Sequence, residues 1–255
     1  MNIRIINATG MGTSDPARSA AELLVYTKST RLEQGEDTQR EVSALSPVAM
    51  KEQLDYIANT VRSSWEFVDY TFEITGVTRA FTHQLVRTRH GSYAQQTQRG
   101  IDMTEFDTLK PELIKDQDEN LVSIKSPWDL AMETISRAYS YYKGKGVPAQ
   151  DCRGLLPTNI HTNIIAKFNL RTLADLVGKR DNPRAQGEYI EFIREVVRLV
   201  LEIHPWTQIF LRPDRLATPA LDDLMTTMLG DDSPVDRKEL AAAFKEIDKL
   251  KAAWG

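Results

Sequence analysis

The sequence predicts an α+β fold, because stretches typical of strands and of helices both occur along the chain and no internal repeat is present. Residues 3–6, 65–74 and 158–170 combine β-branched, aromatic and polar side chains in the way expected of strands. Apolar residues at helical spacing occupy most of the remaining chain. No Gly/Ser-rich linker separates these elements, so we expect one domain over 1–212, followed by a helical extension over 213–255.

Cap and turn residues predict where the first helices begin. Ser14-Asp15-Pro16 and Ser46-Pro47 are each typical of a helix start, and the polar stretch 31–45 between these helices is expected to include a surface loop. The predicted inner faces are Ala20, Leu23, Leu24 and Tyr26 for the first helix, and Met50, Leu54, Ile57 and Val61 for the second.

Gly76 is expected to end the strand over 65–74 and to precede a third helix. The apolar stripe of that helix consists of Val77, Phe81 and Leu85. Polar pairs lie on its other sides, so one face can pack while another presents donors. These pairs are Gln84 with Arg87, three residues apart, and Arg79 with His83, four apart. The helical pattern ends near Gly91, and 92–100 is expected to be extended or a loop.

The remaining elements are predicted by the same signals. Residues 102–124 are polar with little periodicity, which indicates an exposed excursion. Further helices are predicted from Pro127 to about Gly144, around 173–179, over about 185–201, 217–230 and 235–252. The inner face of the helix that begins at Pro127 is expected to carry Leu130, Ile135, Ala138 and either Tyr141 or Tyr142.

Composition excludes several classes of protein. The chain has 255 residues, a formal net charge of -4, 41% hydrophobic residues and a single cysteine, Cys152. One cysteine forms no intramolecular disulfide and no thiolate zinc site, so we expect a cytoplasmic protein in which Cys152 is structural. The N-terminus has no signal-peptide pattern and no run of eighteen apolar residues occurs, so we expect neither secretion nor membrane spanning. Mild acidity also argues against direct nucleic-acid binding.

The segment from Arg79 to Arg99 concentrates positive charge. It contains four arginines and two of the four histidines, and no acidic residue occurs between Glu73 and Asp102. A neighbouring subunit, an internal carboxylate or a bound phosphate could each supply the counter-charge. Arginines followed by a run of hydroxyl and amide side chains favour phosphate, since guanidinium groups pair with phosphate oxygens. We therefore interpret the segment as a nucleotide site.

A second segment without acidic residues runs from Gly154 to Ala174 and is flanked by Arg153. The chain has neither a P-loop nor a GxGxxG fingerprint, so a nucleotide or flavin would have to be held in another way. His83 and His90 have no obvious third partner, and we expect no metal site. The alternative interpretation of the arginines is a solvated surface with ion pairs between subunits.

Four ordered elements resemble the flavin-dependent thymidylate synthases. The motif Arg-His-Arg, followed by spaced serines and an Arg-Tyr pair, is similar to Arg87-Thr88-Arg89, Ser92, Thr97 and Arg99-Gly100. Downstream, the family's Ala-Arg-x-x-Leu-Pro, Asn-Ala-Arg-Ser-Leu, Arg and Ala-Gln-Trp-Glu elements resemble Cys152–Pro157, Asn169–Leu173, Arg180 and Ala185–Glu188. The resemblance covers roughly Trp65 to Glu188.

This resemblance implies a compact α+β domain over 1–212 that assembles as a homotetramer with flavin sites between subunits. It also implies FAD, the substrate deoxyuridine monophosphate, and methylenetetrahydrofolate and NADPH as cosubstrates. The implied reaction transfers a one-carbon unit to C5 of the uracil without a cysteine nucleophile, in agreement with the single cysteine of the chain.

The resemblance assigns roles to individual positions. Arg99 and Arg153 suit the phosphate, and Arg87 and Arg180 suit the pyrimidine, where positive charge stabilises negative charge that develops on the ring. The implied substrate-binding residues are Gln84, Arg87, Gln95, Thr97, Gln98, Arg99, Arg153 and Arg180. The implied catalytic residues are Arg87, Arg180 and Thr97, and the implied cofactor-binding residues are Thr88, Arg89, Asn169, Arg171 and Asp175.

Several positions depart from the family pattern, mostly on the flavin side. Thr88 replaces the motif histidine and cannot titrate near neutrality. The other departures are Phe67 for an upstream histidine, Thr97 for serine, Gln98 for a small residue, Gly100 for tyrosine, Asp175 for Asn or His, and Gly187 for tryptophan. They leave two alternatives open: a deoxypyrimidine monophosphate hydroxymethylase, and a noncatalytic nucleotide- or flavin-binding protein. A purely structural arginine network is a further, smaller possibility.

Overall fold

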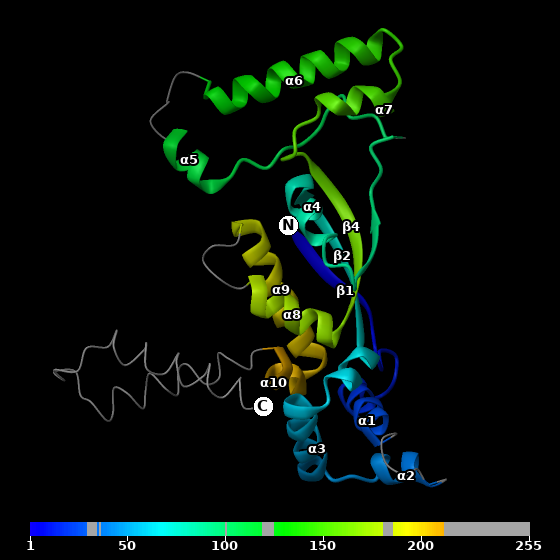
Figure 1. Ribbon diagram of the computed structural model, residues 1–255. Helices are drawn as coiled ribbons and strands as arrows, with labels where there is room; N and C mark the ends of the chain where they lie inside the picture. The colour runs from blue at the N-terminus through cyan, green and yellow to red at the C-terminus, as the bar shows by residue number, and fades with distance from the viewer. Residues whose placement is uncertain (30–34, 36, 100, 119–124, 181–185, 212–255) are drawn as a thin grey trace, which may run out of the picture. The chain divides into compact units, whose positions relative to one another are not determined.

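Within the described residues, four strands form one antiparallel sheet in the order β1-β2-β4-β3 (Figure 1). The computed structural model describes residues 1–29, 35, 37–99, 101–118, 125–180 and 186–211. The strands are β1 (Asn2–Ala8), β2 (Asp69–Thr78), β3 (Ser92–Gln95) and β4 (His161–Asn169). The predicted α+β fold class is confirmed.

Helices precede, separate and follow these strands along the segment Met1–Leu211. The α-helices are α1 (Pro16–Ser29), α2 (Thr38–Ser43), α3 (Pro47–Thr60), α4 (Arg79–Leu85), α5 (Glu112–Asp118), α6 (Pro127–Gly144), α7 (Ala149–Cys152), α8 (Leu170–Arg180), α9 (Gly187–Ile203) and α10 (Gln208–Leu211). Short 3₁₀ turns are η1 (Arg62–Phe67), η2 (Arg153–Leu155) and η3 (Pro205–Thr207). The helices predicted at 217–230 and 235–252, the extension 213–255 as a whole, and the motif positions Gly100 and Ala185 lie outside the described residues.

One face of the sheet is packed and the other is more exposed. Along β4, Ile164, Ala166 and Phe168 are buried in the hydrophobic core, whereas Ile165 between them is 39% exposed. This alternation follows from the two-residue period of side chains in a strand. Helices α8 and α9 contribute their own buried residues to the same core.

The first helices follow their sequence signals closely. Asp15 accepts a hydrogen bond from the Arg18 backbone N–H (2.9 Å), and Ser46 accepts one from the Ala49 N–H (3.2 Å), so both predicted starts are capped. All four predicted core residues of α3 are buried. In α1 the buried face is Ala20, Ala21, Leu24 and Val25, while Leu23 and Tyr26 are only half-buried.

Other predicted boundaries were wrong. Gly76 does not end β2; it has φ +66° beside a register shift between Ile74 and Val77, so the strand bends there and continues to Thr78. Trp65 and Phe67 belong to η1 rather than to the strand. Helix α2 lies within the stretch expected to include a surface loop, and α5, which has no buried residue, lies within the expected exposed excursion, so neither contradicts its prediction. The buried residue of α6 is Tyr139, whereas Leu130, Tyr141 and Tyr142 are 48%, 61% and 48% exposed.

None of the helices in the described part of the chain combines the length and apolarity that crossing a membrane requires.

Candidate functional site

Helix α4 presents polar side chains on two sides because its apolar side chains anchor it to the core. Phe81 and Leu85 are fully buried, and the Thr78 hydroxyl caps the helix by accepting a hydrogen bond from the Phe81 N–H (3.0 Å). The polar side chains of this region divide into two groups, as their spacing in the sequence predicts. Arg79 and His83 line one pocket, whereas Gln84 and Arg87 line another.

Backbone hydrogen bonds attach the start of α4 to the segment that follows η2. The N–H groups of Arg79 and Ala80 donate to the carbonyls of Ile160 (3.1 Å) and Thr158 (2.8 Å). Two N–H groups that no helical turn satisfies thereby gain partners. Arg79 and Arg153, which are distant in the sequence, consequently reach the same pocket.

This pocket, here called the Arg153 pocket, has a volume of about 570 Å³. Its lining residues are Arg79, His83, Gln98, Gln150, Asp151, Arg153, Gly154, Leu156, Pro157 and Thr158. Burial lowers the pKa of Arg79 below its usual value, and the nearby charge of Arg153 lowers it further. The Arg79 Nη2 donates to the Gln96 carbonyl (2.6 Å), while its buried Nε has no hydrogen-bond partner among the residues that the structure describes. Two guanidinium groups here outnumber the single carboxylate of Asp151, an arrangement that favours an anionic ligand.

The second pocket, here called the Arg180 pocket, has a volume of about 330 Å³ and lies between the turn after α4 and helix α8. Its lining residues are Gln84, Arg87, Thr88, Arg89, His90, Thr172, Asp175, Leu176, Lys179 and Arg180. Arg87, Arg89, Lys179 and Arg180 supply four cationic groups, against the one carboxylate of Asp175. The two pockets share no lining residue.

Buried apolar residues of α8 fix the position of the pocket wall that this helix forms. Leu173, Leu176 and Val177 pack into the core, so Asp175 and Lys179 project from the opposite side of the helix. On the other wall, the Gln84 Nε2 donates to the Gln186 Oε1 (2.6 Å), which connects α4 to the start of α9. The wall formed by α4 and the wall formed by α8 are therefore both supported by the core.

Five residues predicted for the site lie outside both pockets. The Gln95 amide donates to the Thr82 hydroxyl (2.8 Å), and the Thr97 hydroxyl accepts from the Arg99 backbone N–H (3.1 Å). Arg99 itself is exposed. The last two are Asn169, whose side-chain oxygen caps α8 by accepting from the Thr172 N–H (2.8 Å), and Arg171, which pairs with Glu66 (2.7 Å).

The structure also brings in residues to which the family resemblance assigned no role. Arg79 and His83 line the Arg153 pocket, and their four-residue spacing was a usable signal. Gln186 and Tyr189 contact residues of the Arg180 pocket, and no local pattern indicates this.

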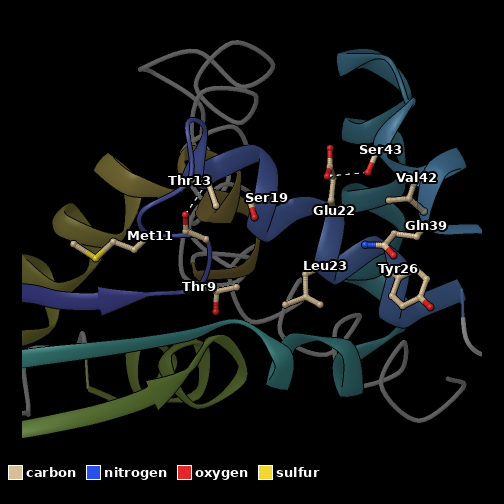
Figure 2. A pocket seen from close by; sticks show the side chains of 11 residues that line it. Thr9, Met11, Thr13, Ser19, Glu22, Leu23, Tyr26, Gln39, Val42 and Ser43 are labelled. Carbon is tan, nitrogen blue, oxygen red and sulfur yellow. Dashed lines mark hydrogen bonds between the residues drawn. The ribbon is translucent and has the colours of Figure 1, made fainter.

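A third pocket, of about 490 Å³, lies between the turn after β1, helix α1 and helix α2 (Figure 2). Its polar lining consists mainly of hydroxyl groups, with Glu22 as its one charged residue. The carboxylate of Glu22 is held by Arg18 (2.6 Å) and by the Ser43 hydroxyl (3.1 Å). No arginine of the predicted site lines this pocket.

The sheet, the helices that pack on it and the two pockets define an α+β protein with two cationic pockets on either side of α4. The chain belongs to the thymidylate synthase complementing protein family, whose sequence model matches residues 9–206. The family suggested by the sequence motifs is thereby confirmed.

Relatives with known names agree with this assignment. A flavin-dependent thymidylate synthase of Geobacter sulfurreducens is 35% identical over 146 residues, which cover 56% of this chain and 61% of the relative. One of Pyrococcus furiosus is 39% identical over 138 residues, covering 54% of each chain. The alignments thus span little more than half the length of these relatives.

A solved structure shows the same fold. The crystal structure of thymidylate synthase X from Helicobacter pylori with FAD and dUMP superposes with a TM-score of 0.59 at 17% identity. The match covers 83% of this chain and 97% of that one.

Proposed function

We propose that this protein transfers a one-carbon unit from methylenetetrahydrofolate to C5 of deoxyuridine monophosphate, giving thymidylate, with FAD as cofactor and NADPH as reductant. The observation that carries the proposal is the pair of cationic pockets on either side of α4, in a chain that belongs to this family. The names of the relatives, flavin-dependent thymidylate synthase, support the same reaction.

The Arg153 pocket is the proposed place of the nucleotide phosphate. Guanidinium groups of Arg79 and Arg153 are available to its oxygens, and the amide of Gln98 adds a donor. Arg99 is exposed and directly follows Gln98 in the chain, and we propose that it contributes a further positive charge. Gln95 and Thr97 are assigned to more distant contacts with the substrate. An anionic ligand would relieve the repulsion between Arg79 and Arg153, which adds to burial in lowering the pKa of Arg79.

The Arg180 pocket fits an anionic cofactor, since four cationic side chains surround one carboxylate. We assign Arg89, Thr88 and Asp175 to holding the flavin there, together with Asn169 and Arg171 at the start of α8. When bound, FAD supplies the reducing equivalents of the reaction. Arg87 and Arg180 are the proposed catalytic residues, which polarise the uracil and stabilise the negative charge on its oxygens. Thr97, the third proposed catalytic residue, is assigned a hydrogen bond to the substrate.

Cys152 plays no nucleophilic part in this mechanism. Its side chain is buried and its Sγ lies 3.5 Å from the Val147 carbonyl oxygen, so it packs within the α6–α7 region. Attack on C6 of the pyrimidine by a thiolate is therefore not required of this chain.

The proposed assembly is a cytoplasmic homotetramer. We infer that the sites lie between subunits, with the Arg153 pocket of one copy and the Arg180 pocket of another around a single nucleotide, because Arg153 and Arg180 line different pockets of one chain. The domain over 1–212 would then carry the sites, and the extension 213–255 would contribute to subunit packing. Membranes and nucleic acids are not among the proposed partners.

A hydroxymethylase acting on a deoxypyrimidine monophosphate is the second candidate function. Thr88 lines the Arg180 pocket at the position of the motif histidine, and its small hydroxyl leaves room for water beside the transferred carbon. In that case water would trap the one-carbon unit before it is reduced.

The deciding experiment is to reconstitute the protein with FAD and to incubate it with dUMP, methylenetetrahydrofolate and NADPH. Mass spectrometry of the nucleotide distinguishes a methylated product from a hydroxymethylated one. The Arg153→Ala and Arg180→Ala variants serve as negative controls. Nucleotide binding without flavin binding or turnover would instead favour a noncatalytic binding protein.

A further inference from the structure

Tyr189 lies in the first turn of α9 and is completely buried. Its ring centroid is 5.2 Å from that of Phe81, which belongs to α4, and 5.8 Å from that of Phe192. These aromatic contacts fix the plane of the ring, because tilted aromatic pairs tolerate little rotation in a close-packed core.

The guanidinium of Arg180 lies over the ring of Tyr189. The guanidinium carbon of Arg180 lies 5.0 Å from the Tyr189 ring centroid, within the range of a cation–π contact. Arg180 lines the Arg180 pocket, whereas Tyr189 does not. The ring therefore lies behind a guanidinium whose other side faces the pocket.

The phenol hydroxyl of Tyr189 lies near two side chains of the same pocket, Thr88 and Arg180. Burial raises the pKa of Tyr189, opposed by the nearby Thr88 side chain and the Arg180 guanidinium, so the ring stays neutral at physiological pH. Among the described residues, its hydroxyl has no partner with hydrogen-bond geometry. Because the phenol is neutral, the contact between Arg180 and the ring is a cation–π contact and not an ion pair.

We propose that Tyr189 is a positioning residue that holds the Arg180 guanidinium at the edge of the Arg180 pocket through its aromatic face. Arg180 is a long side chain at the last position of α8, where the helix imposes little restraint on it. Ordering such a side chain before a ligand arrives lowers the entropic cost of binding. The consequence for nucleotide binding rests on the proposed function, whereas the contact itself does not.

The contact is tested without any ligand through the chemical reactivity of Arg180. Phenylglyoxal modification is followed by peptide mass spectrometry, with the exposed Arg87 as internal reference. Tyr189→Leu removes the aromatic face and is expected to raise the modification rate of Arg180 about fivefold. Tyr189→Phe keeps the face and is expected to stay within about twofold of wild type. Equal rates in wild type and Tyr189→Leu would overturn the inference.

The functional consequence is tested by calorimetric titration with dUMP. Tyr189→Leu is expected to raise the dissociation constant for dUMP about tenfold, whereas Tyr189→Phe should bind dUMP like wild type. In an Arg180→Ala background, Tyr189→Leu should cause no further rise in the dissociation constant. Phe72→Leu, in the core on β2, controls for loss of stability alone and should leave the dissociation constant unchanged. Equal losses from Tyr189→Leu with and without Arg180 would refute positioning through that arginine. If wild-type protein binds no dUMP, the proposed function fails. The contact between Tyr189 and Arg180 is then tested by the rate of phenylglyoxal modification alone.

Discussion

The carboxylate of Glu188 accepts two hydrogen bonds from Thr78, one from its backbone N–H (2.8 Å) and one from its hydroxyl (2.6 Å). Both residues are buried. Thr78 is the N-cap of α4, and Glu188 lies in the first turn of α9, so this contact fixes the helix that separates the two cationic pockets.

Replacing Glu188 by alanine should therefore destabilise the fold. The change leaves the Thr78 N–H and hydroxyl buried without their acceptor, at a cost of about 2–3 kcal/mol in the free energy of unfolding. Glu188→Gln keeps one acceptor and should lose about half as much. Urea denaturation followed by circular dichroism measures both; a loss below about 0.5 kcal/mol in the alanine variant would contradict this role.

Removing the proposed phosphate ligands should weaken nucleotide binding. Arg153→Ala and Arg99→Ala are each expected to raise the dissociation constant for dUMP by about tenfold or more, because a charge-assisted hydrogen bond contributes about 1.5–3 kcal/mol. Calorimetric titration at fixed salt is the measurement. Arg198→Ala is the matched control, since Arg198 is an exposed arginine of α9 that pairs with Glu195 and Glu202.

The phosphate assignment fails if both variants bind dUMP as tightly as wild type. An effect of Arg153→Ala alone would instead leave the Arg153 pocket as the binding place and remove Arg99 from it. Because Arg79 shares that pocket, Arg79→Ala should then behave like Arg153→Ala.

The sequence predicts the local parts of this site better than its assembly. Helical spacing correctly separates Arg79 and His83 from Gln84 on α4, and Arg87, in the turn that follows the helix, lines the same pocket as Gln84. The approach of Arg153 to Arg79 depends on backbone hydrogen bonds from α4 to the segment after η2, which no local pattern specifies.

Boundary errors have a similar origin. Gly76 carries both a turn signal and a bulge signal, and only pairing of β2 with β4 selects the bulge. Tyr189 reads as an ordinary apolar position of an amphipathic helix. Its contact with Arg180 exists because α8 and α9 pack against each other.

His204 should make the stability of the fold depend on pH. Burial lowers its pKa to about 4, while nearby backbone carbonyls of Thr9 and Pro16 oppose that shift. Its Nδ1 lies 2.7 Å from the Tyr70 hydroxyl, an arrangement that suits the neutral imidazole. The folded state therefore binds fewer protons than the unfolded state, and the stability contributed by neutral His204 is lost as pH falls from about 6.5 towards 4.

The expected loss over that window is about 2 kcal/mol, once solvent screening is allowed for. Urea midpoints measured from pH 7 to pH 4 provide the test. His204→Gln, which cannot titrate, should be less stable at pH 7 and should show a flatter profile. An identical slope in both proteins would assign the pH dependence to other groups.

Gly91 is expected to accept no larger residue. A Cβ at this position would lie 2.7 Å from the Phe168 Cε1 and would also meet the Tyr93 hydroxyl. That hydroxyl donates to the carbonyls of Leu85 (3.0 Å) and Thr88 (2.7 Å), so it holds the turn that carries Arg87, Thr88 and Arg89. Gly91→Ala should destabilise the fold by about 1–3 kcal/mol through overpacking.

The same change should loosen the Arg180 pocket, because displacement of Tyr93 releases one of its walls. Flavin retention, measured from the visible spectrum after reconstitution, is expected to fall more steeply than thermal stability. Gly178→Ala is the control: a Cβ there meets nothing within 4 Å, and alanine favours the helix α8 in which it lies. If Gly91→Ala retains flavin as well as Gly178→Ala does, Tyr93 is not what holds the motif turn in place.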